Sequence, residues 1–308
     1  MLGFSTPARA KPRRSPARDV ALAMQSHGAM GRFGDYEVLA PLARGGMGGV
    51  FLAQHVGNGD RVALKVLDPS FADHPEIASR LYAELRVSAR ASHPGLVSIR
   101  AADKSSDDVP YLVMEYLEGE TLAAIADELS LAVKLGIAAQ VASALAALHG
   151  AGVVHCDVKP ENVLVLERDR WSGWPRVKVI DFGVARSIDE VPSEDSTIAG
   201  TPSYMAPEQW RGRPEPASDV YALGCLLYEL VTGTVPFEGS LPQLMIAHAE
   251  QRPGRPGWLA SNVSVELERS ILRALAKDPA LRPTMAELAA QLDALAQAEL
   301  PPRFKLAV

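Results

Sequence analysis

Three polar side chains with complementary chemistry lie within six residues of one another, between two apolar runs: Asp157, Lys159 and Asn162. A carboxylate can accept or orient the proton of a hydroxyl group, and a lysine can offset the charge of a phosphoryl group in transfer. An amide oxygen can ligate magnesium. Asp181 follows the next apolar run, nineteen residues beyond Asn162, and adds a carboxylate that can bind Mg²⁺ between phosphates. Together, these four residues favour phosphoryl chemistry over the alternative that each has an unrelated structural role.

A glycine-rich segment over 43–50 lies between two predicted strands. Walker loops and dinucleotide-binding loops join a strand to a helix, so neither fits this segment. A glycine-rich hairpin can nevertheless bring backbone N–H groups close to phosphates, because no side chain keeps the backbone away. The segment alone does not distinguish a phosphate-binding turn from a flexible one.

One lysine, Lys65, lies inside the otherwise apolar strand predicted over 62–67. A buried ammonium group is costly unless an opposite charge pairs with it, and Glu84 on the next predicted helix is the best candidate. In the alternative, Lys65 lies on a solvent-exposed edge of the sheet and Glu84 lies on a solvent-exposed face of the helix. The two residues alone leave both interpretations open.

The elements that must hold these residues form a sheet-rich part followed by a helix-rich part. Extended apolar runs predict strands over 36–42, 49–55, 62–67 and 111–116, and helical spacing predicts a helix over 76–90. Apolar residues at three- and four-residue steps predict a second helix from Leu131 to Leu148, ended by Gly150 and Gly152. Further runs predict a hairpin over 163–166 and 177–180 and a buried helix over 220–231.

Composition narrows the function classes. The chain has 308 residues, of which 47% are hydrophobic and 22% charged, and it is long enough for two lobes with a sizeable core. A net charge of -6 argues against a general nucleic-acid or anionic-membrane binder. Two cysteines give no disulfide framework, which favours a cytoplasmic protein. The sequence contains no uninterrupted run of 18 apolar residues, so we expect no membrane span.

In their order along the chain, these motifs resemble those of the protein kinase superfamily, in particular the bacterial eukaryotic-like (Hanks-type) serine/threonine kinases. The resemblance covers about residues 34–297. It is carried by the glycine-rich turn, VALK at 62–65, the helix glutamate, VMEY at 113–116, HCDVKPEN at 155–162, DFG at 181–183, GTPSYMAPE at 200–208 and SDVYALG at 218–224.

The resemblance implies an α+β, bilobal fold. A small antiparallel-sheet N-lobe with one main helix is expected over 32–117, and a larger, mostly helical C-lobe over 118–297. Residues 1–31 are rich in arginine and proline and show little hydrophobic periodicity, so we expect a flexible basic tail there. Residues 298–308 are expected to form a C-terminal tail.

The resemblance also implies an ATP site. Lys65 would contact the α- and β-phosphates while Glu84 holds it. The glycines would cover the phosphates, four apolar side chains would enclose adenine, and a methionine would close the back of the pocket. Main-chain groups of Glu115 and Leu117 would hydrogen-bond the base. The residues assigned to these tasks are Leu42, Gly45, Gly46, Gly48, Val50, Ala63, Met114, Glu115, Leu117 and Leu164.

Transfer itself is assigned by the same resemblance to the loop over 155–162. Asp157 would be the catalytic base or orient the substrate hydroxyl, and Lys159 would steady the γ-phosphate. Asn162 and Asp181 would ligate Mg²⁺, with Mn²⁺ as the alternative cation. Thr201, in the loop that receives the substrate, marks serine/threonine specificity together with Lys159. We therefore expect transfer of the γ-phosphate of ATP to serine and threonine hydroxyls of protein substrates, including the kinase itself.

Three further residues of the family pattern are expected to be structural. Glu208 should pair with Arg282 deep in the helical lobe, and Asp219 should anchor the backbone of the catalytic loop.

Two positions depart from the family pattern. Ala43 replaces the first glycine of the turn, which restricts φ and adds a methyl group near the nucleotide. Cys156 stands where most relatives have an arginine that binds a phosphate on the activation loop, which makes this a non-RD kinase. We therefore expect little dependence on loop phosphorylation, despite candidate acceptors at Ser193, Ser196 and Thr197. Redox sensing by Cys156 is a minor alternative, because nothing in the sequence indicates a lowered thiol pKa.

Two other functions stay open. A catalytically weak, kinase-like nucleotide-binding scaffold is favoured by Ala43 and Cys156 and opposed by the intact Lys65, Glu84 and Asp157. A phosphotransferase for small molecules is disfavoured by the APE segment at 206–208, which such enzymes of related fold generally lack. Because the sequence shows no sensor domain, we expect regulation by a partner or by the basic tail.

Overall fold

The structure of the chain, a computed structural model, describes residues 31–45, 48–71, 74–168, 174–188 and 200–300. The chain divides into two units, residues 1–81 with 100–116 and residues 82–99 with 117–308. Gly46, the candidate acceptors Ser193, Ser196 and Thr197, most of the expected basic tail and the last eight residues lie outside the described residues. The lobe boundaries expected from the sequence stay a prediction.

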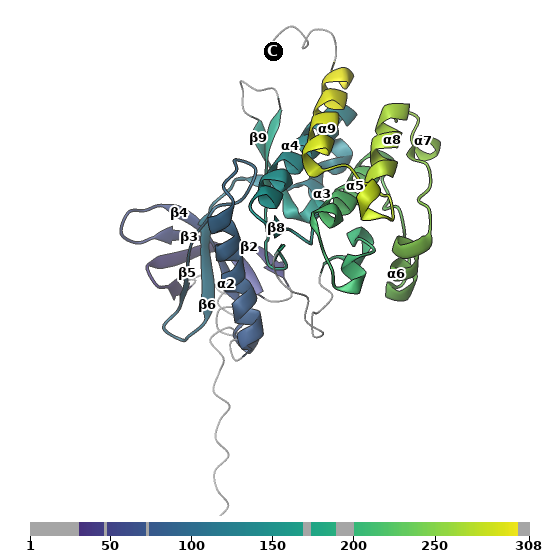
Figure 1. Cartoon of the computed structure of the whole chain (residues 1–308). Coiled ribbons are helices and arrows are strands. Elements are labelled where there is room, and N and C mark those ends of the chain that lie inside the picture. The colour runs from purple at the N-terminus through teal and green to yellow at the C-terminus, as the bar shows by residue number, and fades with distance from the viewer. Residues whose placement is uncertain (1–30, 46–47, 72–73, 169–173, 189–199, 301–308) are drawn as a thin grey trace, which may run out of the picture. The chain divides into compact units, whose positions relative to one another are not determined.

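A six-stranded sheet forms most of the first unit. Its strands follow the order β1-β2-β3-β4-β6-β5, and Figure 1 shows β2 to β6 side by side. The strands are β1 (Arg32–Phe33), β2 (Tyr36–Gly45), β3 (Gly48–His55), β4 (Arg61–Leu67), β5 (Ile99–Lys104) and β6 (Pro110–Glu115). The four strands expected from the sequence are confirmed, whereas β5 was missed because its buried and exposed residues follow no regular alternation.

Alternation of side chains gives this sheet two different faces. The core face carries the buried cluster of Val38, Phe51, Ala53, Val62, Leu64, Val66, Tyr111 and Val113. Residues directly opposite each other in an antiparallel pair share a face. The registers Val50↔Lys65 and Ala63↔Met114 therefore place these four residues together on the other face.

Gly48 is required by the packing of the β2–β3 hairpin. A Cβ atom at this position would lie 2.0 Å from the carbonyl oxygen of Val66, so any side chain would clash with β4. Ala43, in contrast, lies within β2 in register with Val50, where extended backbone suits alanine. The restriction of φ by Ala43 therefore does not disturb the hairpin.

Helices dominate the second unit. They are α3 (Leu122–Ile125), α4 (Leu131–Gly150), α5 (Pro216–Thr232), α6 (Leu241–Glu250), α7 (Pro256–Leu259), α8 (Val265–Ala274) and α9 (Met285–Glu299), while α2 (Pro75–Arg90) runs from the first unit into the second. Capping side chains fix several helix starts: Ser130 accepts from the Val133 N–H, and Thr284 and Glu287 form a capping box. Gly233, at φ 78°, ends α5.

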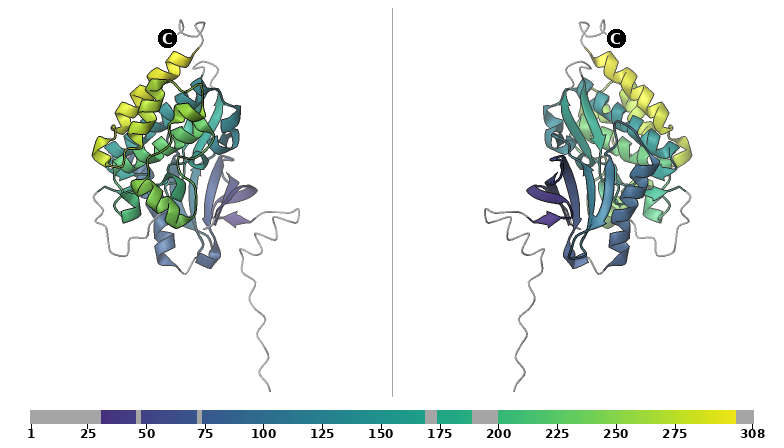
Figure 2. Two further views of the ribbon diagram at one scale, coloured as in Figure 1. Left: turned by 90° about the vertical axis from the view of Figure 1, so that its right-hand side faces the viewer. Right: turned by 90° about the vertical axis from the view of Figure 1, so that its left-hand side faces the viewer.

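Helix α4 is the central helix of this unit. It is long and apolar enough to cross a membrane by length and composition alone. In the structure it packs against α5, β10 and α9, the yellow helix of Figure 2. Half of the residues of α4 are buried. Those contacts are typical of a core helix of a globular unit, as the sequence predicted.

Short strands and turns complete the second unit. The expected hairpin is confirmed as β9 (Val163–Arg168) and β10 (Pro175–Val179), which β7 (Gly119–Thr121) extends, and β8 (Val153–Val154) pairs with β11 (Arg186–Ser187). The 3-10 turns are η1 (Pro69–Phe71, in the first unit), η2 (Ala126–Glu128), η3 (Pro160–Asn162), η4 (Pro202–Tyr204), η5 (Gln209–Arg211) and η6 (Pro279–Leu281). Strands of two or three residues are too short to show a period, so the sequence did not predict them.

Candidate active site

The loop over 155–162 is anchored to α5 by one buried carboxylate. Asp219 accepts the backbone N–H groups of His155 at 2.8 Å and of Cys156 at 2.9 Å, and the ring of His149 lies 2.8 Å away. Burial acts to raise the pKa of Asp219, but the hydrogen bond and charge of His149 and the N–H of His155 hold it below its usual value. Asp219 is thus the anchor that the sequence predicted.

Cys156 turns this loop with a left-handed backbone, at φ 67°, which is uncommon outside glycine. Its carbonyl oxygen accepts from Nε2 of Gln209 at 2.6 Å. Gly200 packs on the same carbonyl, since a Cβ atom there would lie 2.8 Å from it. The sequence analysis missed Gln209 and Gly200 as supports of the loop, because neither carries reactive chemistry that would single it out.

Four of the predicted residues form one hydrogen-bonded cluster. The Thr201 hydroxyl donates to Oδ1 of Asp157 at 2.7 Å and accepts from Nζ of Lys159 at 2.7 Å. Nζ of Lys159 also lies 2.9 Å from Oδ2 of Asp157. Nδ2 of Asn162 donates to the carbonyl of Asp157 at 2.8 Å and to Oδ2 at 3.0 Å. The loop over 155–162 and the segment after Gly200 therefore meet at Asp157.

The side chains of this cluster hold one another in place, and two of them remain partly exposed to solvent. The side chains of Asp157 and Lys159 are 14% and 20% exposed, respectively. The cluster already holds one alcohol, that of Thr201, between a carboxylate that accepts its proton and an ammonium that donates to its oxygen. The same pair of groups can bind the hydroxyl of a substrate and offset negative charge beside it.

Two side chains with oxygen atoms suited to a hard cation, Asn162 and Asp181, belong to backbone segments that bond each other. Because Asp157 accepts from the amide nitrogen of Asn162, the amide oxygen is the atom left for a metal. Asp181 is tied to the same loop, since the N–H of Ile180 donates to the carbonyl of Asn162 at 2.9 Å. An amide and a carboxylate oxygen fit Mg²⁺ that also binds phosphates.

The described ranges contain no group of three or more His, Cys, Asp or Glu side chains that could hold a metal.

The residues predicted for the nucleotide fall in both units. In the first, Val50, Ala63, Lys65 and Met114 share a sheet face, with Glu115 next on β6 and Leu42, Gly45 and Gly48 around the β2–β3 turn. In the second, Glu84 is buried on α2, Leu117 precedes β7, and Leu164 lies in β9 opposite Lys178.

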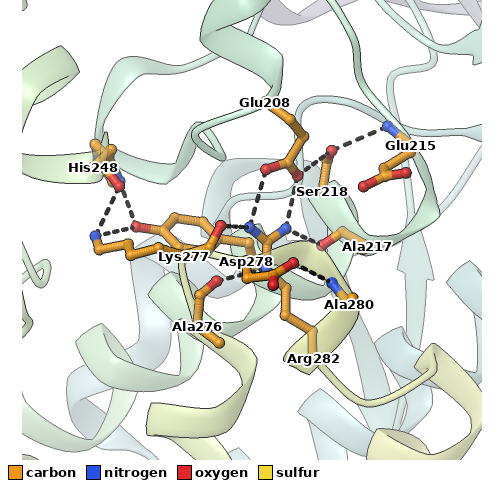
Figure 3. A network of polar contacts seen from close by, with 11 residues as sticks. Glu208, Glu215, Ala217, Ser218, His248, Ala276, Lys277, Asp278, Ala280 and Arg282 are labelled. Atoms are coloured by element: carbon orange, nitrogen blue, oxygen red, sulfur yellow. Dashed lines mark hydrogen bonds and ion pairs between the residues drawn. The ribbon is translucent and has the colours of Figure 1, made fainter. Parts of the chain in front are cut away.

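A second cluster of charged residues lies deep among the helices. Arg282 donates through Nη1 and Nη2 to the two carboxylate oxygens of Glu208, at 2.7 and 3.0 Å, as Figure 3 shows. Its remaining donors reach the carbonyl oxygens of Ala217, Ala276 and Lys277. The ion pair predicted from the sequence is confirmed, and the backbone contacts that complete it could not have been read from the sequence.

Cys156 is buried, and this burial raises the pKa of its thiol well above the usual value. A thiol that stays protonated is a poor nucleophile. The structure therefore speaks against the redox-sensing alternative.

Comparison with known proteins decides the family. Residues 36–292 match the protein kinase domain. The chain belongs to the protein kinase family. It is 42% identical over 254 residues to the serine/threonine-protein kinase Pkn1 of Myxococcus xanthus, and 38% identical over 268 residues to the serine/threonine-protein kinase PknB of Mycobacterium leprae. These matches cover 80% and 83% of this chain, but only 36% and 42% of the relatives.

A solved structure supports the same assignment. The kinase domain of PknI from Mycobacterium tuberculosis, crystallised as a double mutant, is 27% identical, with a TM-score of 0.68 over 88% of this chain and 99% of that one. The bilobal α+β fold and the membership among bacterial Hanks-type kinases are thus confirmed. The family uses ATP and a divalent cation and acts on proteins.

Proposed function

We propose that this chain transfers the γ-phosphate of ATP to serine and threonine hydroxyls of protein substrates. The observation that carries the proposal is the alcohol of Thr201 held between Asp157 and Lys159. A substrate hydroxyl bound in the same way gives its proton to Asp157, while Lys159 offsets the charge of the transferred group. The names of the relatives, which are serine/threonine kinases, support the same substrate class.

Mg²⁺ is the cation that we propose, with Mn²⁺ as a substitute, held by Asn162 and Asp181. When bound, it neutralises phosphate charge. We also propose that Lys65, steadied by Glu84, contacts the α- and β-phosphates, and that Val50, Ala63 and Leu164 enclose adenine. The shared sheet face of Val50, Ala63 and Lys65 supports this assignment.

Asp157→Asn tests the proposal directly. An amide keeps the hydrogen bond with Thr201 but cannot take a proton, so transfer from labelled ATP to dephosphorylated casein in the presence of Mg²⁺ should fall about 10³-fold. Asp107→Asn, the same change at an exposed turn, is the control and should keep full activity. Equal activity of the two variants would refute the assignment of Asp157.

The kinase-like scaffold is separated by the same assay. Nucleotide binding without transfer, in the parent chain as well as in Asp157→Asn, would favour a scaffold. The intact cluster around Asp157 argues for transfer. We further propose a cytoplasmic location. We also propose control by a regulatory partner, which a pull-down with the full chain can test.

A further inference from the structure

One hydrogen bond joins residues 200–209, which we call the substrate segment, to the backbone of the loop over 155–162. Nε2 of Gln209 donates to the carbonyl oxygen of Cys156 at 2.6 Å, and both residues are buried. A carbonyl group left without a donor at this depth is costly, so the amide of Gln209 has a defined task. The bond uses the backbone of residue 156 and needs no charged side chain there.

The peptide unit between Cys156 and Asp157 is held at both of its polar groups. The N–H of Asp157 donates to Nδ1 of His155 at 3.3 Å, and the carbonyl of Cys156 accepts from Gln209. Because a peptide unit is planar, fixing its two polar groups also fixes the Cα atom of Asp157. Gln209 therefore orients the residue that carries the carboxylate of the cluster without touching that carboxylate.

The backbone of Cys156 depends on such support. Its left-handed conformation, at φ 67°, is unfavourable outside glycine and persists only where the surroundings hold it. The N–H of Cys156 donates to Asp219 at 2.9 Å, and the carbonyl group accepts from Gln209. Loss of the Gln209 amide would leave this residue held from its N–H side, so the peptide that leads to Asp157 could rotate.

Gly200 lies directly against the same hydrogen bond. A Cβ atom there would lie 2.6 Å from Nε2 of Gln209 and 2.8 Å from the carbonyl oxygen of Cys156. The backbone of Gly200, at φ 129°, also suits glycine alone. Thr201 follows directly, and its hydroxyl donates to Asp157. The substrate segment is therefore tied to the loop at two places, one near each of its ends.

Gln209 itself is fixed by the deep cluster of charged residues. It follows Glu208, whose carboxylate accepts two hydrogen bonds from Arg282, and it begins η5. The amide therefore extends from a backbone that the helices hold in place. Through it, the deep cluster is connected to the backbone of Cys156.

We propose that Gln209 is a positioning residue for phosphoryl transfer. Its amide N–H orients the peptide that leads into Asp157 and keeps Gly200 and Thr201 against the loop. The inference rests on the proposed function, because it concerns how the carboxylate and the substrate segment are aligned. It assigns the effect to the hydrogen-bond donor of Gln209 and not to the volume of the side chain.

Variants of similar size separate the donor from the volume. Gln209→Met keeps the length of the side chain but cannot donate, so transfer to dephosphorylated casein with Mg²⁺ should fall about tenfold, while the KM for ATP stays within about twofold. Gln140→Met is the matched control, because the Gln140 amide also donates to a backbone carbonyl, that of Pro175 at 2.9 Å, and should keep its activity within about twofold. Equal activity of the two variants would overturn the inference.

Gln209→Glu makes the donor depend on pH. A carboxylate cannot donate to the carbonyl of Cys156, whereas a protonated carboxyl group can. Position 209 is 4% exposed, and such burial raises the pKa of an introduced carboxyl group. Activity relative to the parent chain should be about a tenth near pH 8 and rise to within about threefold near pH 5.5, while the ratio for Gln209→Met stays flat.

Taking the ratio to the parent chain removes the titration of groups that both proteins share, such as Asp157 and His155. A ratio for Gln209→Glu that stays as low and as flat as that of Gln209→Met would overturn the inference, because the donor would then not matter. Recovery at low pH would decide for the donor even if Gln209→Met folded poorly.

Gly200→Ala reaches the same hydrogen bond from its other side. The added methyl group would clash with both partners of the bond, so transfer should again fall about tenfold. The double variant with Gln209→Met should be at most about twofold worse than the poorer single variant, because both changes remove one bond. Losses that multiply would show that the two residues act independently, against the inference.

Hydrogen exchange of the full chain separates a failure of this inference from a failure of the proposed function. The amides of Tyr204 and Met205 bond within the substrate segment, so Gln209→Met should speed exchange over 200–206 about tenfold, and Gln140→Met should not. A parent chain that transfers no phosphate would sink the proposed function, and exchange would still decide the role of Gln209. Unchanged exchange over 200–206 in Gln209→Met would overturn the inference.

Discussion

Two clusters in the second unit use the same kinds of charged group and complete them differently. Around Asp157, the carboxylate, the lysine and the threonine bond one another. Around Arg282, backbone carbonyl groups of Ala217, Ala276 and Lys277 take most of the donors. A side-chain partner can be exchanged for a substrate group by a rotamer change, whereas a backbone partner is fixed by the fold. The first arrangement suits catalysis, and the second suits anchoring.

Arg282→Met should have the largest effect on stability. It leaves the Glu208 carboxylate buried without its cation, so the free energy of unfolding should fall by about 3–5 kcal/mol, as measured with urea. Arg32→Met removes an ion pair whose side chains are 59% and 75% exposed, and should cost under about 1 kcal/mol. Similar losses in the two variants would contradict the anchoring role of the deep cluster.

His248→Gln should change the response to acid. In the folded chain, burial and the charge of Lys277 lower the pKa of His248 from 6.5 to about 4, so the ring stays neutral. Between pH 6.5 and pH 4, the unfolded chain therefore binds a proton at His248 that the folded chain does not bind. Stability is therefore lost as pH falls from about 6.5 to about 4, at up to about 1.4 kcal/mol per pH unit.

Glutamine does not titrate, so His248→Gln should lose less stability than the parent chain between pH 7.5 and pH 5, by about 2 kcal/mol in urea unfolding. Parallel losses in the two proteins would show that His248 is not held neutral.

Thr201→Ala should affect transfer more than stability. Loss of the hydroxyl removes one hydrogen bond to Asp157 and one from Lys159, so transfer to casein should fall about tenfold, while stability changes by under about 1 kcal/mol. Thr201→Ser keeps the hydroxyl and serves as the control. A loss of stability as large as that of Arg282→Met would mean that the two clusters do not differ as described.

Phosphatase treatment should have the smallest effect. Cys156 offers no charged group for a loop phosphate, so a treated sample, mapped by mass spectrometry, should keep its activity within about tenfold of the untreated one. A loss on the order of a hundredfold would contradict this expectation.

Much of the fold was predictable because its signals are local. Extended apolar runs predicted β2, β3, β4 and β6, three- and four-residue spacing predicted α4, and an almost wholly apolar run predicted the buried part of α5. The strands β7, β8 and β11 were not predictable, since they have two or three residues and exist through pairing with distant strands.

The sequence by itself determined the chemistry of the candidate site, because Asp157, Lys159, Asn162 and Asp181 are recognisable by residue type and spacing. Only the tertiary structure decided what surrounds them. The hydrogen bond between Thr201 and Asp157 joins residues 44 positions apart, and the hydrogen bond from Gln209 to the carbonyl oxygen of Cys156 joins residues 53 positions apart. Such contacts depend on how loops and helices pack and not on local preference, so no pattern along the chain contains them.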